Sequence, residues 1–180
     1  FNIPRKNIIA VTLPSQNTSG KTKSNATHLM KRLGVTAKEI SIEDGVKLGL
    51  DMIEHKQNKK DVTYENVQAR YRTYTLMNLA NQEDAIVIGT SDMSEIALGW
   101  STFNGDQMAM YGINSGITKT VIQALCKYYQ TLFPEVADTL VDILETPISP
   151  ELSSEDQKTE DVIGKYEIND FILYHFLVRG

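Results

Sequence analysis

The chain has 180 residues, of which 41% are hydrophobic and 23% are charged, the composition of one soluble globular domain with a real core. Its net charge of −5 argues against a nucleic-acid partner, and no apolar run approaches the ~20 residues that cross a bilayer. The single Cys126 and three scattered histidines exclude an internal disulfide and a thiolate-rich zinc site. With no visible signal peptide, we expect a cytoplasmic protein without membrane contact.

The first part of the chain predicts two strand–helix units. The β-branched run at 7–13 predicts a buried strand, and the helix that follows it, around 26–33, ends at Gly34. Residues 38–42 predict a second strand, and residues 43–55 a weaker helix.

A long helix is predicted next, from Thr63 as its cap to about Ala80. One face of this helix is an apolar stripe made of Val67, Tyr71 and Tyr74. A second face is polar and carries Asn66, Arg70 and Thr73. Residues 85–88 predict a third strand, and the Gly-, Ser- and Met-rich residues 100–116 predict a long loop of the kind that is often functional.

The last part of the chain predicts helices at 121–132 and 136–144 and a solvated acidic loop at 151–161. Residues 171–178 are too apolar for a free surface helix and predict burial against a partner subunit. Short apolar strands that alternate with amphipathic helices predict an α/β fold, a doubly wound parallel sheet with helices on both faces. Ligands of such sheets bind beyond the carboxyl ends of the strands.

Residues 15–22 (SQNTSGKT) match a phosphate-binding loop, G-x-x-x-x-G-K-[ST], except that Ser15 replaces the first glycine. That glycine lets backbone N–H groups cradle a phosphate, and Pro14 removes one more donor. A nucleotide site built on Lys21 is therefore the weakest interpretation of this sequence.

The residues after the third strand, 89–95 (GTSDMSE), have two interpretations. Thr90 can bond a phosphate or a base edge while Glu95 holds Mg²⁺, or the acids and hydroxyls simply cap the next helix. Lys119 lies in the first turn of a predicted helix, where the helix dipole disfavours a cation. An anion bound by Lys119 and the free N–H groups of that turn explains it, and a tolerated exposed lysine is the alternative.

Asn66 and Arg70 can meet one ligand from one helix face, although a surface arginine more often pairs with an acid. Trp100 and the methionines of the long loop fill a core or wall a slot for a flat ring.

A series of segments, in this order, carries a family resemblance: DVTYENVQARYR (61–72), IVIGTSDMSEIALGWSTFNGDQM (86–108), NSGITKT (114–120) and ISPEL (148–152). They resemble the synthetase domain of NAD⁺ synthetases, most closely the long glutamine-dependent bacterial type. The resemblance implies a Rossmann-like, adenine nucleotide α-hydrolase-like fold. It also implies that ATP adenylates the nicotinate carboxylate of deamido-NAD and that ammonia, drawn from glutamine, displaces AMP to give NAD.

Carried over by position, the resemblance implies ATP contacts from Thr90, Lys119 and Ser149, with Lys119 also catalytic. Asp106 is implied as a second catalytic residue in a mobile loop, and Glu95 as a ligand of Mg²⁺. Deamido-NAD is expected to contact Asn66, Arg70, Glu95, Trp100, Ser101, Thr102 and Phe103. ATP with Mg²⁺ is then the only cofactor expected, without a prosthetic group, and the family implies a homo-oligomer.

The sequence departs from the short ammonia-dependent members of the family at two positions. Those enzymes carry a lysine where this chain has Phe103, and an aspartate near the position of Met110. The family's S-G-G-x-D-S phosphate loop is absent from these 180 residues. We therefore expect residues 1–180 to be a partial synthetase domain without its first strand and helix, its glutaminase domain or its C-terminal arm, and inactive alone. The alternative is a catalytically dead binding or oligomerisation module of the same fold.

Overall fold

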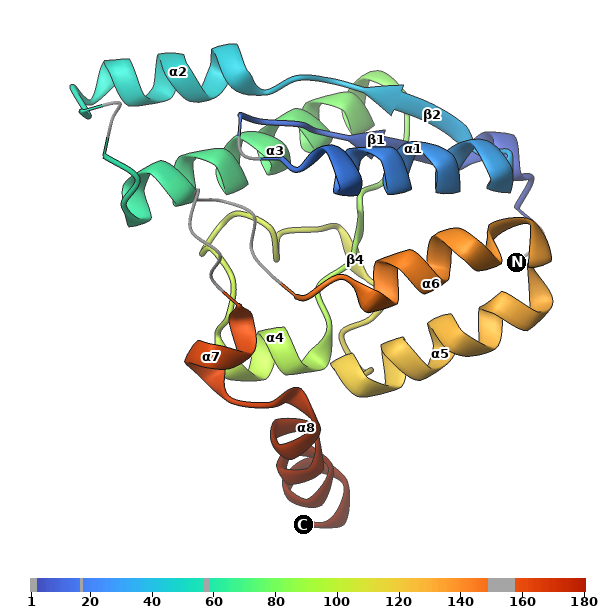
Figure 1. Cartoon of the computed structure of the whole chain (residues 1–180). Helices are drawn as coiled ribbons and strands as arrows, with labels where there is room; N and C mark the ends of the chain where they lie inside the picture. Colours follow the sequence, from blue (N-terminus) through green and yellow to red (C-terminus); the bar gives the residue numbers. More distant parts are fainter. Residues whose placement is uncertain (1–2, 17, 57–58, 149–157) are drawn as a thin grey trace.

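The computed structural model of the chain describes residues 3–16, 18–56, 59–148 and 158–180 (Figure 1). Short strands alternate with helices, as the sequence predicts. The elements of the first half are η1 (Arg5–Asn7), β1 (Ile9–Thr12), α1 (Gly20–Leu33), β2 (Thr36–Glu39), α2 (Glu43–Met52), α3 (Val62–Gln82) and β3 (Ile88–Gly89). Those of the second half are α4 (Met93–Leu98), β4 (Tyr111–Gly112), α5 (Lys119–Leu132), η2 (Pro134–Val136), α6 (Ala137–Glu145), α7 (Thr159–Ile163), α8 (Tyr166–Tyr174) and the π-helical η3 (His175–Arg179).

The strands form two parallel pairs. In the first pair β1 runs beside β2 with Ile9 opposite Thr36, and in the second β3 runs beside β4 with Ile88 opposite Tyr111. Parallel pairing joined by helical crossovers confirms the α/β class. Within the described parts of the chain, no ladder joins the two pairs.

Strand boundaries differ from the predicted ones. The strand predicted at 38–42 begins two residues earlier, because pairing with β1 sets its register and leaves Ile42 free to enter the core. The strand predicted at 85–88 is reduced to Ile88–Gly89. The loop predicted at 100–116 contains a strand, β4, because Gly89 lets the chain approach closely: a Cβ there would lie 2.6 Å from Cβ of Ala109.

The core lies between α2, α3 and the end of β1. Buried side chains at its centre are Ile42, Val46, Leu50 and Tyr64, with Leu13, Val67 and Tyr71 packed against them. Two of the three predicted stripe residues of α3 are therefore in this core. The third, Tyr74, is 65% exposed, and its ring lies edge-on to that of Tyr71 with 6.1 Å between the centroids.

The cap of α3 is Asp61 and not Thr63. Asp61 Oδ1 accepts the N–H groups of Thr63 (3.0 Å) and Tyr64 (3.2 Å), so the helix begins before the predicted cap. The Lys59 ammonium, the Tyr64 N–H and His55 together hold the pKa of the Asp61 carboxyl well below its usual range.

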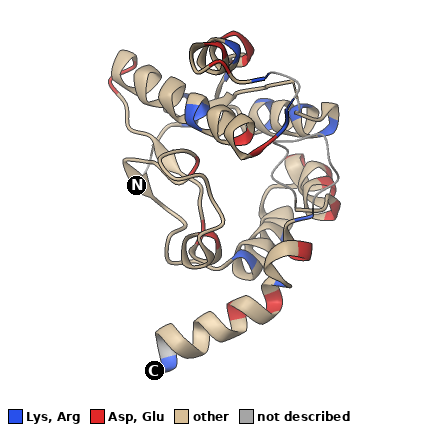
Figure 2. Ribbon diagram, turned by 90° about the vertical axis from the view of Figure 1, so that its left-hand side faces the viewer, with Lys and Arg blue, Asp and Glu red and all other residues tan. Residues whose placement is uncertain are grey.

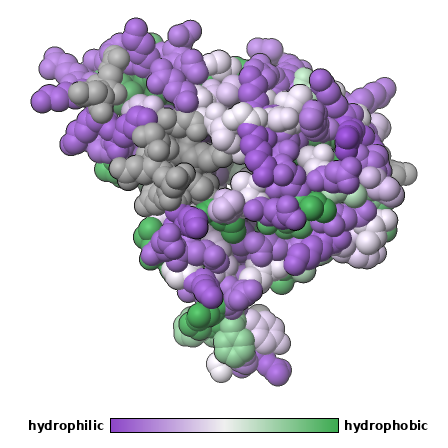
Figure 3. All heavy atoms as spheres, in the orientation of Figure 1, coloured by the Kyte–Doolittle hydropathy of each residue, from purple (hydrophilic) through white to green (hydrophobic). Residues whose placement is uncertain are grey.

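The C-terminal helix α8 and η3 project from the body of the molecule (Figure 1). They carry few charged residues (Figure 2) and present an apolar surface (Figure 3). Large apolar side chains there are between 47% and 76% exposed: Ile168, Phe171, Ile172, Tyr174, Phe176 and Leu177. The predicted burial of this segment against a partner subunit stays a prediction. In the part of the chain that the structure describes, none of the helices combines the length and the apolar character that crossing a bilayer requires.

Candidate functional site

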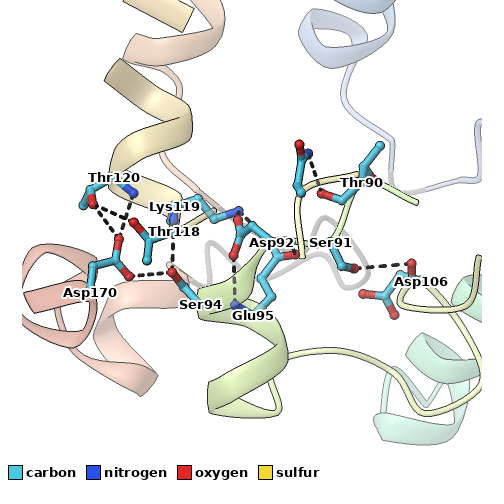
Figure 4. A network of polar contacts seen from close by, with 11 residues as sticks. Thr90, Ser91, Asp92, Ser94, Glu95, Asp106, Thr118, Lys119, Thr120 and Asp170 are labelled. Atoms are coloured by element: carbon cyan, nitrogen blue, oxygen red, sulfur yellow. Dashed lines mark hydrogen bonds and ion pairs between the residues drawn. The ribbon is translucent and has the colours of Figure 1, made fainter. Parts of the chain in front are cut away.

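The residues after β3 turn directly into α4 through a capping box. Asp92 Oδ1 accepts the N–H of Glu95 at 2.9 Å, and Glu95 Oε2 accepts the N–H of Asp92 at 3.3 Å. The capping interpretation of this segment is therefore correct for both acids. It leaves Asp92 Oδ2 and Glu95 Oε1 facing the start of α5 (Figure 4).

Lys119 fills the space between these two carboxylates. Its Nζ lies 2.6 Å from Asp92 Oδ2 and 2.6 Å from Glu95 Oε1. The Asp92 side chain is 1% exposed, that of Lys119 17% and that of Glu95 23%, so this is a largely buried cluster of three charges. Burial opposes the ammonium charge, but the hydrogen bonds that the ammonium donates to Asp92 and Glu95 outweigh it and raise the pKa of Lys119 above its usual value. Lys119 is therefore a cation at neutral pH.

Two N–H groups in the first turn of α5, which the sequence led us to expect free, have partners within the protein. The Lys119 N–H donates to Ser94 Oγ (3.0 Å), and the Thr120 N–H donates to Asp170 Oδ2 (2.8 Å). Asp170, from α8, is thus the anion that the positive end of α5 receives. No sequence pattern indicates this contact, because Asp170 lies 50 residues beyond Thr120 along the chain.

Tyr166, also on α8, completes the surroundings of Lys119. Its ring centroid lies 5.6 Å from Lys119 Nζ, within the range of a cation–π contact. Tyr166 is 2% exposed, and burial raises the pKa of its phenol to about 12, so the ring stays neutral. Its hydroxyl is buried and has no hydrogen-bond partner among the residues that the structure describes.

The predicted polar face of α3 holds the loop around residues 102–105. The contacts are Thr102 Oγ1 to Asn66 Oδ1 (2.9 Å), Arg70 Nε to the Phe103 carbonyl (3.2 Å) and Thr73 Oγ1 to the Gly105 carbonyl (2.6 Å). The shared face is confirmed, and Asn66 and Arg70 meet the loop that carries the other expected dinucleotide contacts. Trp100 and Ser101 are half-buried and Thr102 is buried, whereas the Phe103 ring is 79% exposed and open to a flat partner.

Asp106 links this loop to the segment after β3. Its Oδ1 accepts the Thr102 N–H at 2.8 Å, and its carbonyl lies 3.5 Å from Ser91 Oγ. Thr90 is exposed next to it, and its carbonyl accepts Asn114 Nδ2 at 3.3 Å. The structure thus brings Glu95 to Lys119, and Asn66 and Arg70 to the loop that carries Phe103. Thr90 stands in the segment that leads to Glu95 and, within the described part of the chain, makes no hydrogen bond to either group. Ser149 lies outside the described residues.

The lysine of the motif after Pro14, Lys21, is paired with an acid on α6. Residues 20–22 form the first turn of α1, whose cap Ser19 accepts the Thr22 N–H at 3.1 Å. The Lys21 ammonium lies 2.8 Å from Asp142 Oδ1 on α6, where it lowers the pKa of that carboxyl. The ion pair between Lys21 and Asp142 agrees with the ranking of a Lys21-based nucleotide site as the weakest interpretation of the sequence.

Two carboxylates, those of Asp92 and Glu95, are the oxygen groups beside Lys119 that a metal ion such as Mg²⁺ would use. Across the described ranges, no group of three or more His, Cys, Asp or Glu side chains gathers as a metal site. The oxygens of Asp92 and Glu95 suit Mg²⁺ in kind, and Mg²⁺ commonly takes one or two carboxylates together with substrate phosphates. The Asp92 and Glu95 carboxylates therefore fit Mg²⁺ on two conditions. Phosphate oxygens must complete the coordination of the ion, and the Lys119 ammonium must move out from between the two carboxylates.

A family model described as NAD synthase matches residues 2–179 of the chain. The chain belongs to the NAD synthase family. It is 45% identical over 98% of its length to the glutamine-dependent NAD(+) synthetase of Mycobacterium leprae and 33% identical over 93% to that of Acinetobacter baylyi. The chain spans 28% and 31% of the length of these two curated relatives.

Solved structures agree on the fold. NMN synthetase from Francisella tularensis aligns with 91% of the chain and 65% of its own, at a TM-score of 0.78 and 29% identity. The glutamine-dependent NAD+ synthetase of Acinetobacter baumannii in complex with ADP aligns with 92% of the chain and 29% of its own, at a TM-score of 0.67 and 25% identity. The Rossmann-like, adenine nucleotide α-hydrolase-like fold expected from the sequence is confirmed.

Proposed function

We propose that this chain carries the site at which ATP activates the nicotinate carboxylate of deamido-NAD and ammonia converts it into the amide of NAD. The observation that carries the proposal is the buried cluster of Lys119, Asp92 and Glu95 at the carboxyl end of β3, the edge where parallel sheets bind ligands. Family membership and the high identity to glutamine-dependent NAD(+) synthetases support the choice of reaction.

In the first step a carboxylate oxygen of the nicotinate forms a bond to the α-phosphorus of ATP, and the bond to pyrophosphate breaks. The chain supplies a cation for the charge that pyrophosphate carries away, because the pKa of Lys119 lies above its usual value and keeps its ammonium protonated at neutral pH. To reach a phosphate, Lys119 exchanges one of its two carboxylate partners for a phosphate oxygen. In the second step ammonia attacks the carboxyl carbon of the adenylate, AMP leaves, and the nitrogen loses a proton.

Mg²⁺ bound with ATP would add charge neutralisation to the departing phosphates. Glu95, together with Asp92, would hold it on the protein side. The loop at 102–105 and the polar face of α3 are proposed to seat the dinucleotide, with the exposed Phe103 ring stacked on a flat base and Arg70 near its phosphates. Thr90, exposed beside the cluster, is proposed to contact ATP, as is Ser149.

Glutamine is proposed as the source of ammonia, as in the names of the relatives, and the natural assembly as a cytoplasmic homo-oligomer. Because these 180 residues contain no S-G-G-x-D-S segment, the isolated chain is proposed to bind ligand without turnover.

The test is amide formation by the natural polypeptide that carries this sequence, supplied with Mg-ATP and ammonia. Deamido-NAD should be the better substrate, and a preference for nicotinate mononucleotide would move the chain toward the NMN-forming relative. Lys119→Met should lower kcat about 10²–10³-fold, the loss expected for one charge-stabilising group. Lys21→Met is the matched control and should stay within about twofold, because its ammonium pairs with Asp142. Equal losses in both variants would sink the proposal.

A catalytically dead assembly module is the second candidate, favoured by the exposed apolar side chains of α8 and η3. This alternative predicts that millimolar Mg-ATP or deamido-NAD does not raise the melting temperature. It also predicts that Lys119→Met has no effect on amide formation. Stabilisation of the wild-type chain by either ligand would exclude it.

A further inference from the structure

We propose that Asp170 is a positioning residue of this site: it holds Lys119 and Glu95 at their working separation by tying α4 and α5 to α8. The claim rests on the proposed function for its catalytic consequence, and on contacts among described residues for its geometry. Figure 4 shows the residues involved.

Asp170 lies at the point where three helices meet. It is 5% exposed, and its two oxygens have separate tasks. Oδ1 accepts the hydroxyl of Ser94, on α4, at 2.5 Å. Oδ2 accepts both the N–H (2.8 Å) and the hydroxyl (2.7 Å) of Thr120, on α5. Hydrogen bonds to a buried carboxylate are among the stronger ones in proteins, so this junction is rigid.

The junction fixes the helix that bears Lys119. The residue before α5, Thr118, makes no side-chain cap bond, so α5 takes its cap from outside. Asp170 bonds the Thr120 N–H directly, and it reaches the Lys119 N–H through Ser94, whose hydroxyl accepts that N–H at 3.0 Å. Both ends of the Lys119 residue are thus held, its backbone by this relay and its ammonium by the two carboxylates.

The same junction fixes the acids. Ser94 is fully buried and stands in the α4 turn between Asp92 and Glu95. The bond from Ser94 to Asp170 therefore sets the position of α4, and with it both carboxylates, relative to α5. Tyr166, one helical turn before Asp170, presses its ring toward the Lys119 ammonium, so α8 contacts the cluster twice.

The test compares Asp170→Asn, Lys119→Met and the double variant in the natural polypeptide, with Glu167→Gln as the matched control. Glu167 is an exposed acid on the same helix. Asp170→Asn keeps the shape and removes the charge, and it should lower kcat for amide formation about 10–100-fold, the cost of misplacing a reacting group. The KM for deamido-NAD should change less than about threefold, because the dinucleotide seat on α3 is untouched.

The double variant separates positioning from general destabilisation. If Asp170 acts through Lys119, adding Asp170→Asn to Lys119→Met lowers kcat no further, whereas independent effects multiply. The inference would be overturned if the two substitutions lower kcat multiplicatively, or if a folded Asp170→Asn protein has a kcat within twofold of wild type. Should Asp170→Asn fail to fold, Ser94→Ala interrupts the relay alone and must show the same pattern.

A second readout does not depend on turnover. Competitive acetylation followed by peptide mass spectrometry compares Lys119 with Lys127, an exposed lysine of the same helix. The Lys119 to Lys127 labelling ratio should rise in Asp170→Asn, because the Lys119 side chain, 17% exposed between Asp92 and Glu95, becomes accessible once α4 and α5 are no longer tied to α8. It should not change in Glu167→Gln. An unchanged ratio in Asp170→Asn overturns the positioning claim, whereas wild-type protein without amide formation overturns only the proposed function.

Discussion

Replacing Lys119 by Met should destabilise the fold measurably, because it leaves two acids facing each other without their cation. The stem of the side chain is kept and the ammonium is lost. Removing one partner of a buried ion pair costs roughly 3–5 kcal/mol. The Glu95 side chain is 23% exposed and regains some water, so we expect a loss of about 2–4 kcal/mol.

Urea unfolding followed by circular dichroism measures this loss, and a domain of this size should also melt lower by about 6–12 °C. Lys127→Met, on the exposed side of α5, is the control and should stay within about 0.5 kcal/mol. Adding Asp92→Asn to Lys119→Met should restore part of the loss, since Asn caps a helix about as well as Asp without the charge. A Lys119→Met loss below about 0.5 kcal/mol, or no recovery in the double variant, would refute the reasoning.

Three further predictions concern the pH range and the core. The folded-state pKa of Lys119 is raised, and that of Tyr166 rises from 10.0 to about 12, so the stability that these two groups contribute is present below pH 10 and lost above it. Urea unfolding from pH 8 to 11.5 should show this fall in the free energy of unfolding, and a flat profile would contradict the prediction. The folded-state pKa of Asp61 is lowered, so its contribution is present above pH 3.8 and lost as the pH falls; Asp61→Asn should flatten the acid limb of the stability profile. Gly49→Ala should lower the free energy of unfolding by about 1–3 kcal/mol, because its Cβ would lie 2.7 Å from Tyr71 Cε2. Adding Tyr71→Leu should relieve this penalty. Equal melting temperatures of Gly49→Ala and wild type would speak against this packing.

The class of fold was predictable because the strand and helix periods are strong. The end of α1 was also predictable, since Gly34 takes a left-handed φ of 67° there. Strand lengths were not, because register depends on the partner strand: Tyr111–Gly112 has no strand period of its own and is ordered by β3.

The candidate site was predictable only on its local side. Thr90, Glu95 and Lys119 stand at element ends, where the sequence leaves ligand binding and helix capping or an exposed lysine as alternatives, and Asn66 and Arg70 share a helix face by spacing. Asp170 and Tyr166 carry no such signal, because their relation to Lys119 exists only after α8 packs on α4 and α5. The expectation that the N–H groups at the start of α5 are free for an anion fails at Lys119 and Thr120 for the same reason, because Ser94 and the distant Asp170 already accept them.

The most direct test of the account follows one oxygen atom. Deamido-NAD labelled with ¹⁸O in its nicotinate carboxylate is converted by the natural polypeptide with Mg-ATP and ammonia, and the AMP is examined by mass spectrometry. Attack of the carboxylate on the α-phosphorus predicts one ¹⁸O in each AMP and none in pyrophosphate, at a rate that falls with Lys119→Met. Unlabelled AMP, or label released as inorganic phosphate, would contradict activation of the carboxylate at this site.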